Sequence, residues 1–128
     1  MKASVPGFME ARMRELVFLA GAILAPFLSF AVQPEQVDVF ESGKDGYAFF
    51  RIPAVVAGNG AVLAFCEGRR HDRRDSDDID LVLRRSTDGG KTWGPLRIVW
   101  DDGANTCGNP VPVVDRSTVR VWLFTTWN

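Results

Sequence analysis

The sequence has few of the residues that most often carry metal or thiol chemistry. Its 128 residues include two cysteines, Cys66 and Cys107, one histidine, His71, and one tyrosine, Tyr47. Two cysteines exclude a metal cluster held by several thiolates. His71 stands among charged residues, where we expect a solvated side chain and not a base or a ligand. No residue pattern in the chain implies a metal or an organic cofactor.

The chain also lacks an excess of charge of either sign. It has 15 Lys and Arg residues against 16 Asp and Glu residues, which gives a formal net charge of −1. Proteins that bind nucleic acid or anionic membranes through their overall field carry a basic excess. Neither partner is therefore expected, and an anionic ligand would have to be held by local arginines.

The N-terminal region has the layout of an export signal. A run without charged residues spans positions 16–31 and follows two arginines. Ser29 and Ala31, near its end, are small enough for a cleavage site. We predict a signal peptide over residues 1–31 and a folded region over residues 32–128. An uncleaved membrane anchor is the alternative, although the run is shorter than the roughly twenty residues that span a bilayer. Either way we expect an exported protein that is periplasmic, bound to the cell surface or secreted.

Export would permit a disulfide bond between Cys66 and Cys107. Cys66 lies within an apolar run, which favours a buried free thiol instead. The sequence leaves both alternatives open.

Beyond the export segment, short apolar runs alternate with Gly, Asp, Asn and Pro, without a sustained helical period. This pattern predicts an all-β chain with antiparallel strands at residues 37–41, 50–56, 61–66, 79–85, 96–100 and 119–126. Gly58-Asn59-Gly60 suits a tight hairpin. Pro53 cannot donate to a ladder, which places its strand at a sheet edge. The chain ends in an apolar strand without a closing turn, so we expect a fragment with one apolar face uncovered.

Residues 86–93, STDGGKTW, match the pattern SxDxGxxW, known as the Asp-box. Ser86 opens the pattern, and Asp88 can accept hydrogen bonds from backbone N–H groups. Gly90 can adopt a left-handed conformation, and Trp93 can pack beneath the loop. We expect these residues to shape a turn and take no part in catalysis. The Asp-box occurs in several β-propeller families, so it points to that fold.

Four further segments, in this order, resemble the sialidase family. Phe50-Arg51-Ile52-Pro53 is similar to its FRIP or YRIP motif, and Glu67-Gly68-Arg69 is similar to an E-G-R that follows. Residues 79–86, IDLVLRRS, are similar to the strand that runs into the first Asp-box of the family. Residues 108–115, GNPVPVVD, are similar to an N-P-x-P-x-x-D segment of the next inner strand. The resemblance covers about residues 37–128.

The resemblance implies binding roles for three residues. The FRIP arginine, here Arg51, is one of three that clamp the carboxylate of sialic acid, and guanidinium meets a carboxylate bidentately. Pairing with a neighbouring acid is its alternative role. Arg69 is implied to contact the sugar near its carboxylate or 4-hydroxyl, with an ion pair to Glu67 or a loop acid as the alternative. Asn109 is implied to bind sugar hydroxyls, or else to satisfy backbone groups.

The resemblance also implies an acid/base aspartate in the loop before strand 79–86. Ungapped alignment backwards from this strand places it at Asp75, with Asp72, Asp77 and Asp78 as competitors. Shielding by bound substrate would raise the pKa of such a carboxyl, because desolvation disfavours the charged form. Exposed among arginines, the same side chain would stay ionised.

The expected whole is a β-propeller, six-bladed in the complete family, of which this chain supplies about the first blade and part of the second. The implied reaction is hydrolysis of terminal α-linked sialic acid from glycoproteins, glycolipids or other sialylated glycans, with retention through a tyrosyl intermediate. Tyr47 is not at the position of the family's nucleophile, so the fragment alone is expected to be inactive. The alternative is a non-catalytic sugar-binding propeller.

Overall fold

The computed structural model describes residues 35–128, and over that range it contains strands and loops but no helix. The predicted signal peptide lies outside the described residues. Within residues 35–128 there is consequently no helical segment of the length and apolar character needed to cross a bilayer. The six strands are β1 (Phe49–Gly58), β2 (Ala61–Arg69), β3 (Ile79–Ser86), β4 (Arg97–Trp100), β5 (Cys107–Asp115) and β6 (Arg120–Trp127).

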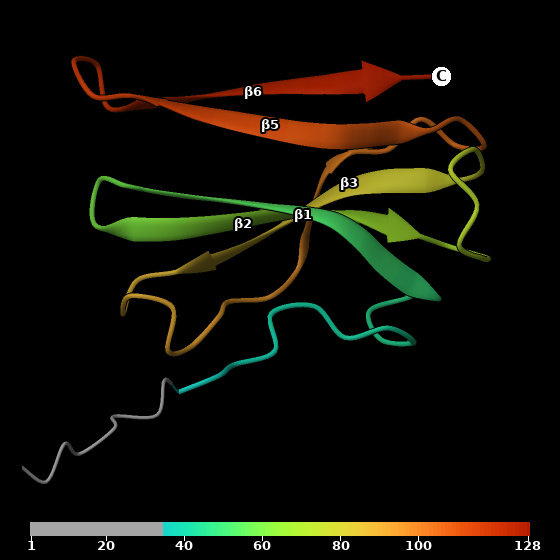
Figure 1. Cartoon of the computed structure of the whole chain (residues 1–128), viewed down its shortest axis with the longest axis horizontal. Coiled ribbons are helices and arrows are strands. Elements are labelled where there is room, and N and C mark those ends of the chain that lie inside the picture. The colour runs from blue at the N-terminus through green and yellow to red at the C-terminus, as the bar shows by residue number, and fades with distance from the viewer. Residues whose placement is uncertain (1–34) are drawn as a thin grey trace, which may run out of the picture. The chain divides into compact units, whose positions relative to one another are not determined.

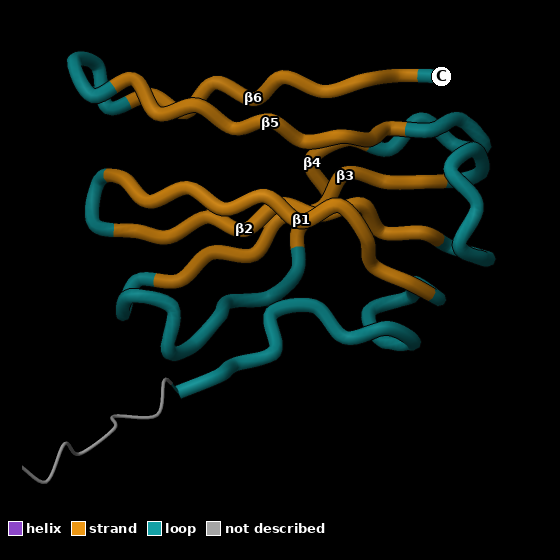
Figure 2. Tube along the Cα trace, viewed as in Figure 1, coloured by secondary structure: helices purple, strands orange, loops and turns teal. Residues whose placement is uncertain are grey.

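The strands form two antiparallel sheets (Figures 1 and 2). The first sheet has the order β1-β2-β3-β4, and the second is the hairpin β5-β6. Strand β5 packs against β1, β2 and β3 of the first sheet. This is the all-β arrangement that the sequence predicts, with one four-stranded blade followed by the first two strands of another.

The first hairpin follows its turn signal. Gly58 pairs with Ala61, and the residues between them, Asn59 and Gly60, have φ values of 50° and 68°. Positive φ at both central positions is the geometry of a type I′ hairpin turn. Pro53 lies on β1, which is an edge strand as predicted.

The predicted strand at residues 37–41 is wrong. This segment is irregular, and no described strand pairs with it. Phe40 instead packs on the core, with its ring 5.3 Å from that of Phe50. An alternating apolar pattern makes a strand only where another strand offers its backbone groups, and residues 37–41 find none.

The core of the first sheet centres on Tyr47, Cys66 and Val82. Cys66 and Cys107 are both buried and both free, which favours the free-thiol alternative. The second hairpin, in contrast, exposes apolar side chains, as expected of a face without a covering layer. The exposed set includes Val111, Val113, Trp122, Phe124 and Trp127.

Strands β1 and β5 share a kink at corresponding places. In each, the pairing register shifts around a residue of positive φ that precedes a proline. In β1 this residue is Ile52, with φ 54°, before Pro53, and in β5 it is Asn109, with φ 52°, before Pro110. Positive φ is uncommon for residues other than glycine and is an outlier for a β-branched one. Bulges of this kind re-aim side chains at a sheet edge.

The two kinks are also held in the same way. The Cys66 thiol on β2 donates to the Arg51 carbonyl at 2.9 Å. The Thr125 hydroxyl on β6 donates to the Gly108 carbonyl, the corresponding position of β5. Burial raises the pKa of the Cys66 thiol to about 12, so it keeps the proton that it donates. In both hairpins a neighbouring side chain therefore fixes the carbonyl just before the kink.

Candidate active site

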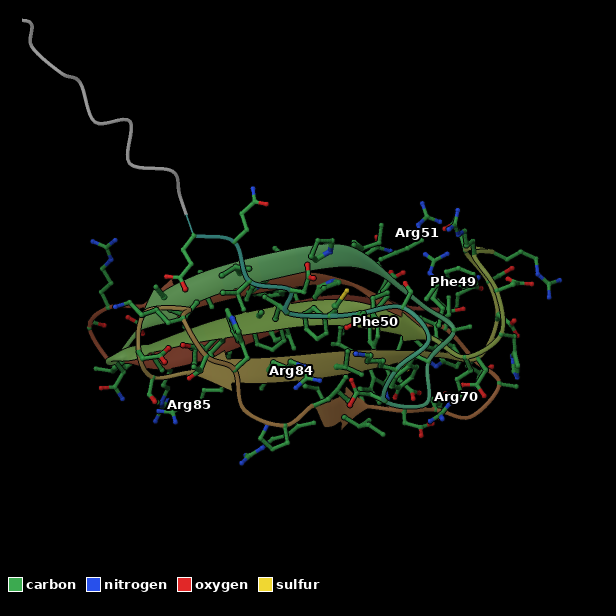
Figure 3. The ribbon with its side chains drawn as sticks, turned by 90° about the horizontal axis from the view of Figure 1, so that it is seen from below. Phe49, Phe50, Arg51, Arg70, Arg84 and Arg85 are labelled. Atoms are coloured by element: carbon green, nitrogen blue, oxygen red, sulfur yellow. The ribbon has the colours of Figure 1, made fainter. Side chains whose placement is uncertain are left out.

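The kinks of β1 and β5 face the loop after β2 across a cavity of about 250 Å³. All four residues predicted to bind or act on a ligand line it. Figure 3 shows Arg51 beside this loop, at the end of the sheet where Phe49 lies and away from Arg84 and Arg85. The complete lining consists of Arg51, Ile52, Glu67, Arg69, Asp75, Thr106 and Asn109.

Arg51 reaches the cavity from the edge strand β1. Its Nη1 atom donates to Asp75 Oδ1 at 2.9 Å and to the Arg73 carbonyl at 3.0 Å. The side chain is 42% exposed. The guanidinium is therefore open on one side to a ligand while one nitrogen is held by the loop.

Arg69 lies at the end of β2 and its side chain is only 3% exposed. Its Nη2 atom is 2.6 Å from Glu67 Oε2 and 2.9 Å from Asp75 Oδ1, so both ion pairs considered as alternatives are present. Its Nη1 atom also donates to the carbonyl groups of Arg73 and Arg74. Burial acts to lower the pKa of Arg69, but the two carboxylates outweigh it and raise the pKa above the usual value. Arg69 is thus a fixed cation, and its hydrogen bonds also hold the loop that follows β2.

Asp75 places one carboxylate oxygen between two guanidinium groups. The hydrogen bond from Arg69 and the charge of Arg51 lower the pKa of Asp75 below its ordinary value. The side chain is 82% exposed. This is the ionised, arginine-surrounded state expected of an exposed loop acid, although the arginines responsible are these two and not the neighbouring Arg73 and Arg74.

The competing loop acids point elsewhere. Asp72 pairs with Arg74 at 2.6 Å, Asp77 lies 3.3 Å from His71, and Asp78 lies 3.3 Å from Arg70. None of the three lines the cavity.

Asn109 enters from the second sheet at the kink of β5. Its backbone N–H donates to Glu67 Oε1 at 2.9 Å, and its side-chain amide donates to Thr126 Oγ1 at 2.9 Å. The amide oxygen has no protein partner among the hydrogen bonds of the described residues, so it is available to a ligand hydroxyl.

Sequence reasoning missed three residues of the lining. Ile52 is part of the FRIP-like motif but is given no role by it, yet it lies at the cavity with a positive φ. The sequence suggests Glu67 only as a partner of Arg69, although a carboxylate between Cys66 and Gly68 in an apolar strand signals a buried polar contact. Thr106 precedes β5 and carried no signal in the sequence.

The Asp-box residues form a turn remote from the cavity. The Ser86 hydroxyl accepts from the Gly90 N–H at 2.8 Å and donates to Asp88 Oδ1 at 2.7 Å. Asp88 also accepts from the backbone and hydroxyl of Thr92, and these bonds strongly lower its pKa. Trp93 donates to the Gly90 carbonyl at 3.1 Å, beneath the loop.

A larger depression, of about 330 Å³, lies beside this turn. It is lined by arginine, threonine, tryptophan, glycine and proline residues and contains no carboxyl group. Without an acid it offers no proton transfer. The first cavity is the candidate active site because two guanidinium groups meet one carboxylate oxygen there.

Comparison with known proteins connects this geometry to one family. No family model matches the chain. It is 48% identical to the exo-alpha-sialidase of Aspergillus fumigatus over 90 residues, which are 65% of this chain and 22% of that protein. It is 37% identical to a sialidase of Bacteroides fragilis over 101 residues, 71% of this chain and 19% of that protein.

A solved structure, the Hadza microbial sialidase Hz136, matches with a TM-score of 0.61 and 32% identity, over 67% of this chain and 19% of that chain. The chain therefore spans about a fifth of the length of the relatives it matches. Over about two thirds of its own length, the chain is a sialidase homologue in both sequence and fold.

Proposed function

We propose that this chain contributes part of the active site of an exo-α-sialidase that hydrolyses terminal sialic acids from glycoconjugates with retention. One observation carries the proposal. Arg51 and Arg69, from different strands, both bind a single oxygen of Asp75 at 2.9 Å, inside a shared cavity. A pair of fixed cations around one carboxylate oxygen is a site for an anionic sugar.

In this proposal the carboxylate of the substrate takes the place that the Asp75 carboxylate occupies beside the arginines. Arg51 binds it from the edge strand, and Arg69 holds the ring from the other side. Asn109 binds a sugar hydroxyl through its amide oxygen. The 82% exposure of Asp75 supports this exchange, since its side chain is free to turn outward when it is displaced.

Displacement also converts Asp75 into an acid. Beside Arg69 and Arg51 its pKa is lowered, so it holds no proton near neutral pH. Away from both cations and covered by the bound sugar, its carboxyl group would have a raised pKa, because desolvation disfavours the charged form. Asp75 then donates a proton to the glycosidic oxygen as the bond to the anomeric carbon breaks. It later takes a proton from the water that releases the sugar.

In this proposal the nucleophile is a residue that is not among the 128 residues of this sequence. Tyr47 is the only tyrosine, and it is 3% exposed with its hydroxyl bonded to Asp80. A group held in this way cannot reach a sugar in the cavity. We propose that residues 32–128 alone do not hydrolyse sialosides.

A second function, sugar binding without turnover, is favoured by the observed state of Asp75. Its lowered pKa and double ion pair suit a residue that holds two arginines in place. The two functions differ in what removal of this carboxylate does. In a binding protein, removal of the Asp75 carboxylate leaves the arginines that bind the sugar. In an enzyme, the same removal also takes away the proton donor and so slows hydrolysis.

The experiment compares Asp75→Asn with the wild type in the full-length protein that contains this chain. The substrates are an aryl sialoside, whose leaving group needs little protonation, and sialyllactose, whose leaving group needs much. We expect kcat/KM for sialyllactose to fall on the order of 10²–10⁴-fold, with a smaller loss for the aryl sialoside. Asp72→Asn removes a neighbouring loop acid that does not line the cavity, and it should leave both rates unchanged.

Equal losses on the two substrates would contradict proton donation by Asp75. Wild-type protein that binds sialyllactose without hydrolysing it would favour the binding function.

We further propose that the protein acts after export on sialylated glycoproteins or glycolipids, with residues 1–31 removed as a signal peptide. The charge-free run at 16–31 supports this. Mass spectrometry of the mature N-terminus tests it, and a retained residue 1 would contradict cleavage.

A further inference from the structure

Glu67 is a buried carboxylate that contacts both sheets. It lies on β2, is 3% exposed and pairs in the ladder with Arg51. Its Oε2 atom accepts from Arg69 Nε at 3.2 Å and from Arg69 Nη2 at 2.6 Å. Its Oε1 atom accepts from the backbone N–H of Asn109 on β5 at 2.9 Å. The two oxygens of Glu67 thus bind different residues of the cavity lining, Oε2 binding Arg69 and Oε1 binding Asn109.

The space around Glu67 Oε1 is shaped for this contact. A Cβ atom at Gly108 would lie 2.5 Å from Oε1, a distance that real Cβ atoms essentially never show. The kink at Asn109, with φ 52°, coincides with the register shift of β5 and turns its N–H toward Glu67. A glycine and a kink in one sheet therefore accommodate a carboxylate from the other.

Glu67 also acts on the acid loop through Arg69. The Arg69 guanidinium donates to the Arg73 and Arg74 carbonyls and pairs with Asp75. The direction of this guanidinium is set by its Nε and Nη2 bonds to Glu67. Loss of the Glu67 carboxylate would free Arg69 to turn, and with it the segment that carries Asp75.

We infer that Glu67 is a positioning residue, which holds Arg69 of one sheet and Asn109 of the other at fixed positions within one site. The inference rests on the proposed function for its kinetic consequence, and it does not require Glu67 to touch substrate. A buried ion pair could instead only stabilise the fold. The two roles predict different kinetics.

Glu67→Gln is the first test variant. A glutamine has one acceptor oxygen and one donor amide, so it can satisfy either Asn109 or Arg69 but not both. Gly108→Ala is the second, because it keeps the Glu67 charge and displaces Oε1. If Glu67 acts by positioning Arg69 and Asn109, both variants should raise the KM, although Glu67→Gln loses a charge and Gly108→Ala loses none.

Matched controls come from the same elements. Asp80→Asn breaks another buried ion pair, with Arg70, on the neighbouring strand and outside the cavity. Gly58→Ala places a Cβ 3.1 Å from Val114 of β5, and so crowds the contact between the two sheets as Gly108→Ala does, but through β1 and at the hairpin end. Both controls test whether lost stability alone changes the kinetics.

Two measurements are made. The first is steady-state hydrolysis of sialyllactose by the full-length protein, and the second is hydrogen exchange at the Asn109 backbone N–H and the Arg69 Nε–H. We expect the KM of Glu67→Gln and Gly108→Ala to rise about tenfold or more, since a misplaced binding group weakens every later step. Exchange should accelerate in Glu67→Gln at whichever site the glutamine leaves unsatisfied, and in Gly108→Ala at the Asn109 backbone N–H, whose acceptor Oε1 is displaced. The two controls should keep the wild-type KM and the wild-type exchange at these sites.

An unchanged KM in folded Glu67→Gln would overturn the inference, as would wild-type exchange at both sites. Wild-type protein without sialoside hydrolysis would contradict the proposed function instead. Exchange at Asn109 and Arg69 would then still decide whether Glu67 holds them together.

Discussion

The Tyr47 hydroxyl donates a 2.5 Å hydrogen bond to the Asp80 carboxylate, and both side chains are buried. Arg70 completes the group, with its Nη2 atom 2.7 Å from Asp80 Oδ2 and its guanidinium 5.1 Å from the centre of the Tyr47 ring. The other carboxylate oxygen, Oδ1, has no partner among the described residues. Asp80 therefore depends strongly on the two bonds that it has.

Tyr47→Phe tests this dependence. The substitution keeps the ring but removes one donor, and an under-satisfied buried acceptor costs about 1–3 kcal/mol. We expect the free energy of unfolding in urea to fall by about that amount. In an Asp80→Asn background the same change should cost less, because the charged acceptor is gone. Equal costs in both backgrounds would show that the hydrogen bond contributes nothing specific.

Ser86→Ala should destabilise the Asp-box turn. Ser86 is 1% exposed, and its hydroxyl bonds both the Gly90 N–H and Asp88. Its loss leaves the half-buried Gly90 N–H without this partner, and the loss of such a hydrogen bond costs about 0.5–1.5 kcal/mol in the free energy of unfolding. The exposed neighbour Thr87 supplies the control, since Thr87→Ala removes a hydroxyl next to the turn. A smaller effect of Ser86→Ala than of Thr87→Ala would contradict the assigned role.

Turn aspartates should make the protein sensitive to acid. Hydrogen bonds from Ser117 and Thr118 lower the pKa of Asp115 from 3.8 to about 2, and the pKa of Asp88 is lowered too. A folded pKa below the unfolded value stabilises the protein above the unfolded pKa, and this contribution is lost as pH falls through the folded pKa.

We therefore expect the free energy of unfolding to decrease as pH falls from about 4 to about 2, as followed by urea unfolding at each pH. Asp115→Asn should weaken this dependence while lowering stability at pH 6. An unchanged slope in that variant would assign the acid sensitivity to other groups.

Arg51→Lys tests the proposed binding of a substrate carboxylate. Lysine keeps the charge but has neither the fork nor the reach of guanidinium. We expect KM for a sialoside to rise about tenfold or more, equivalent to about 1.4 kcal/mol, with a smaller change in kcat.

Arg73→Lys is the matched control for Arg51→Lys. The Arg73 side chain stacks on the Phe49 ring and does not line the cavity. A KM that rises equally in the two variants would argue against a specific role for Arg51.

The sequence predicts those parts of the fold that depend on short-range signals. The hairpin at Asn59-Gly60 needs only two residues of positive φ, and Pro53 by itself places β1 at an edge. The strand prediction for residues 37–41 is wrong because strand formation depends on a partner elsewhere in the chain. Alternation alone could not report that no partner lies beside it.

The site shows the same division. Arg51, Arg69 and Asn109 could be named from contiguous motifs, and Asp75 from its distance along the chain to the strand at 79–86. The contact between Glu67 and Asn109 joins residues 42 positions apart and depends on how β5 approaches β2. The low pKa of Asp75 likewise depends on two arginines that meet only in the folded chain.

The matching kinks of β1 and β5 have a consequence for how such a pocket can change. Ile52 and Asn109 occupy equivalent positions in successive hairpins, and both line the same cavity. A substitution at either alters the chemistry presented to a guest molecule, while the two carbonyl anchors belong to the preceding residues, Arg51 and Gly108. The lining can therefore differ by one side chain per repeat while the anchor of each kink is kept.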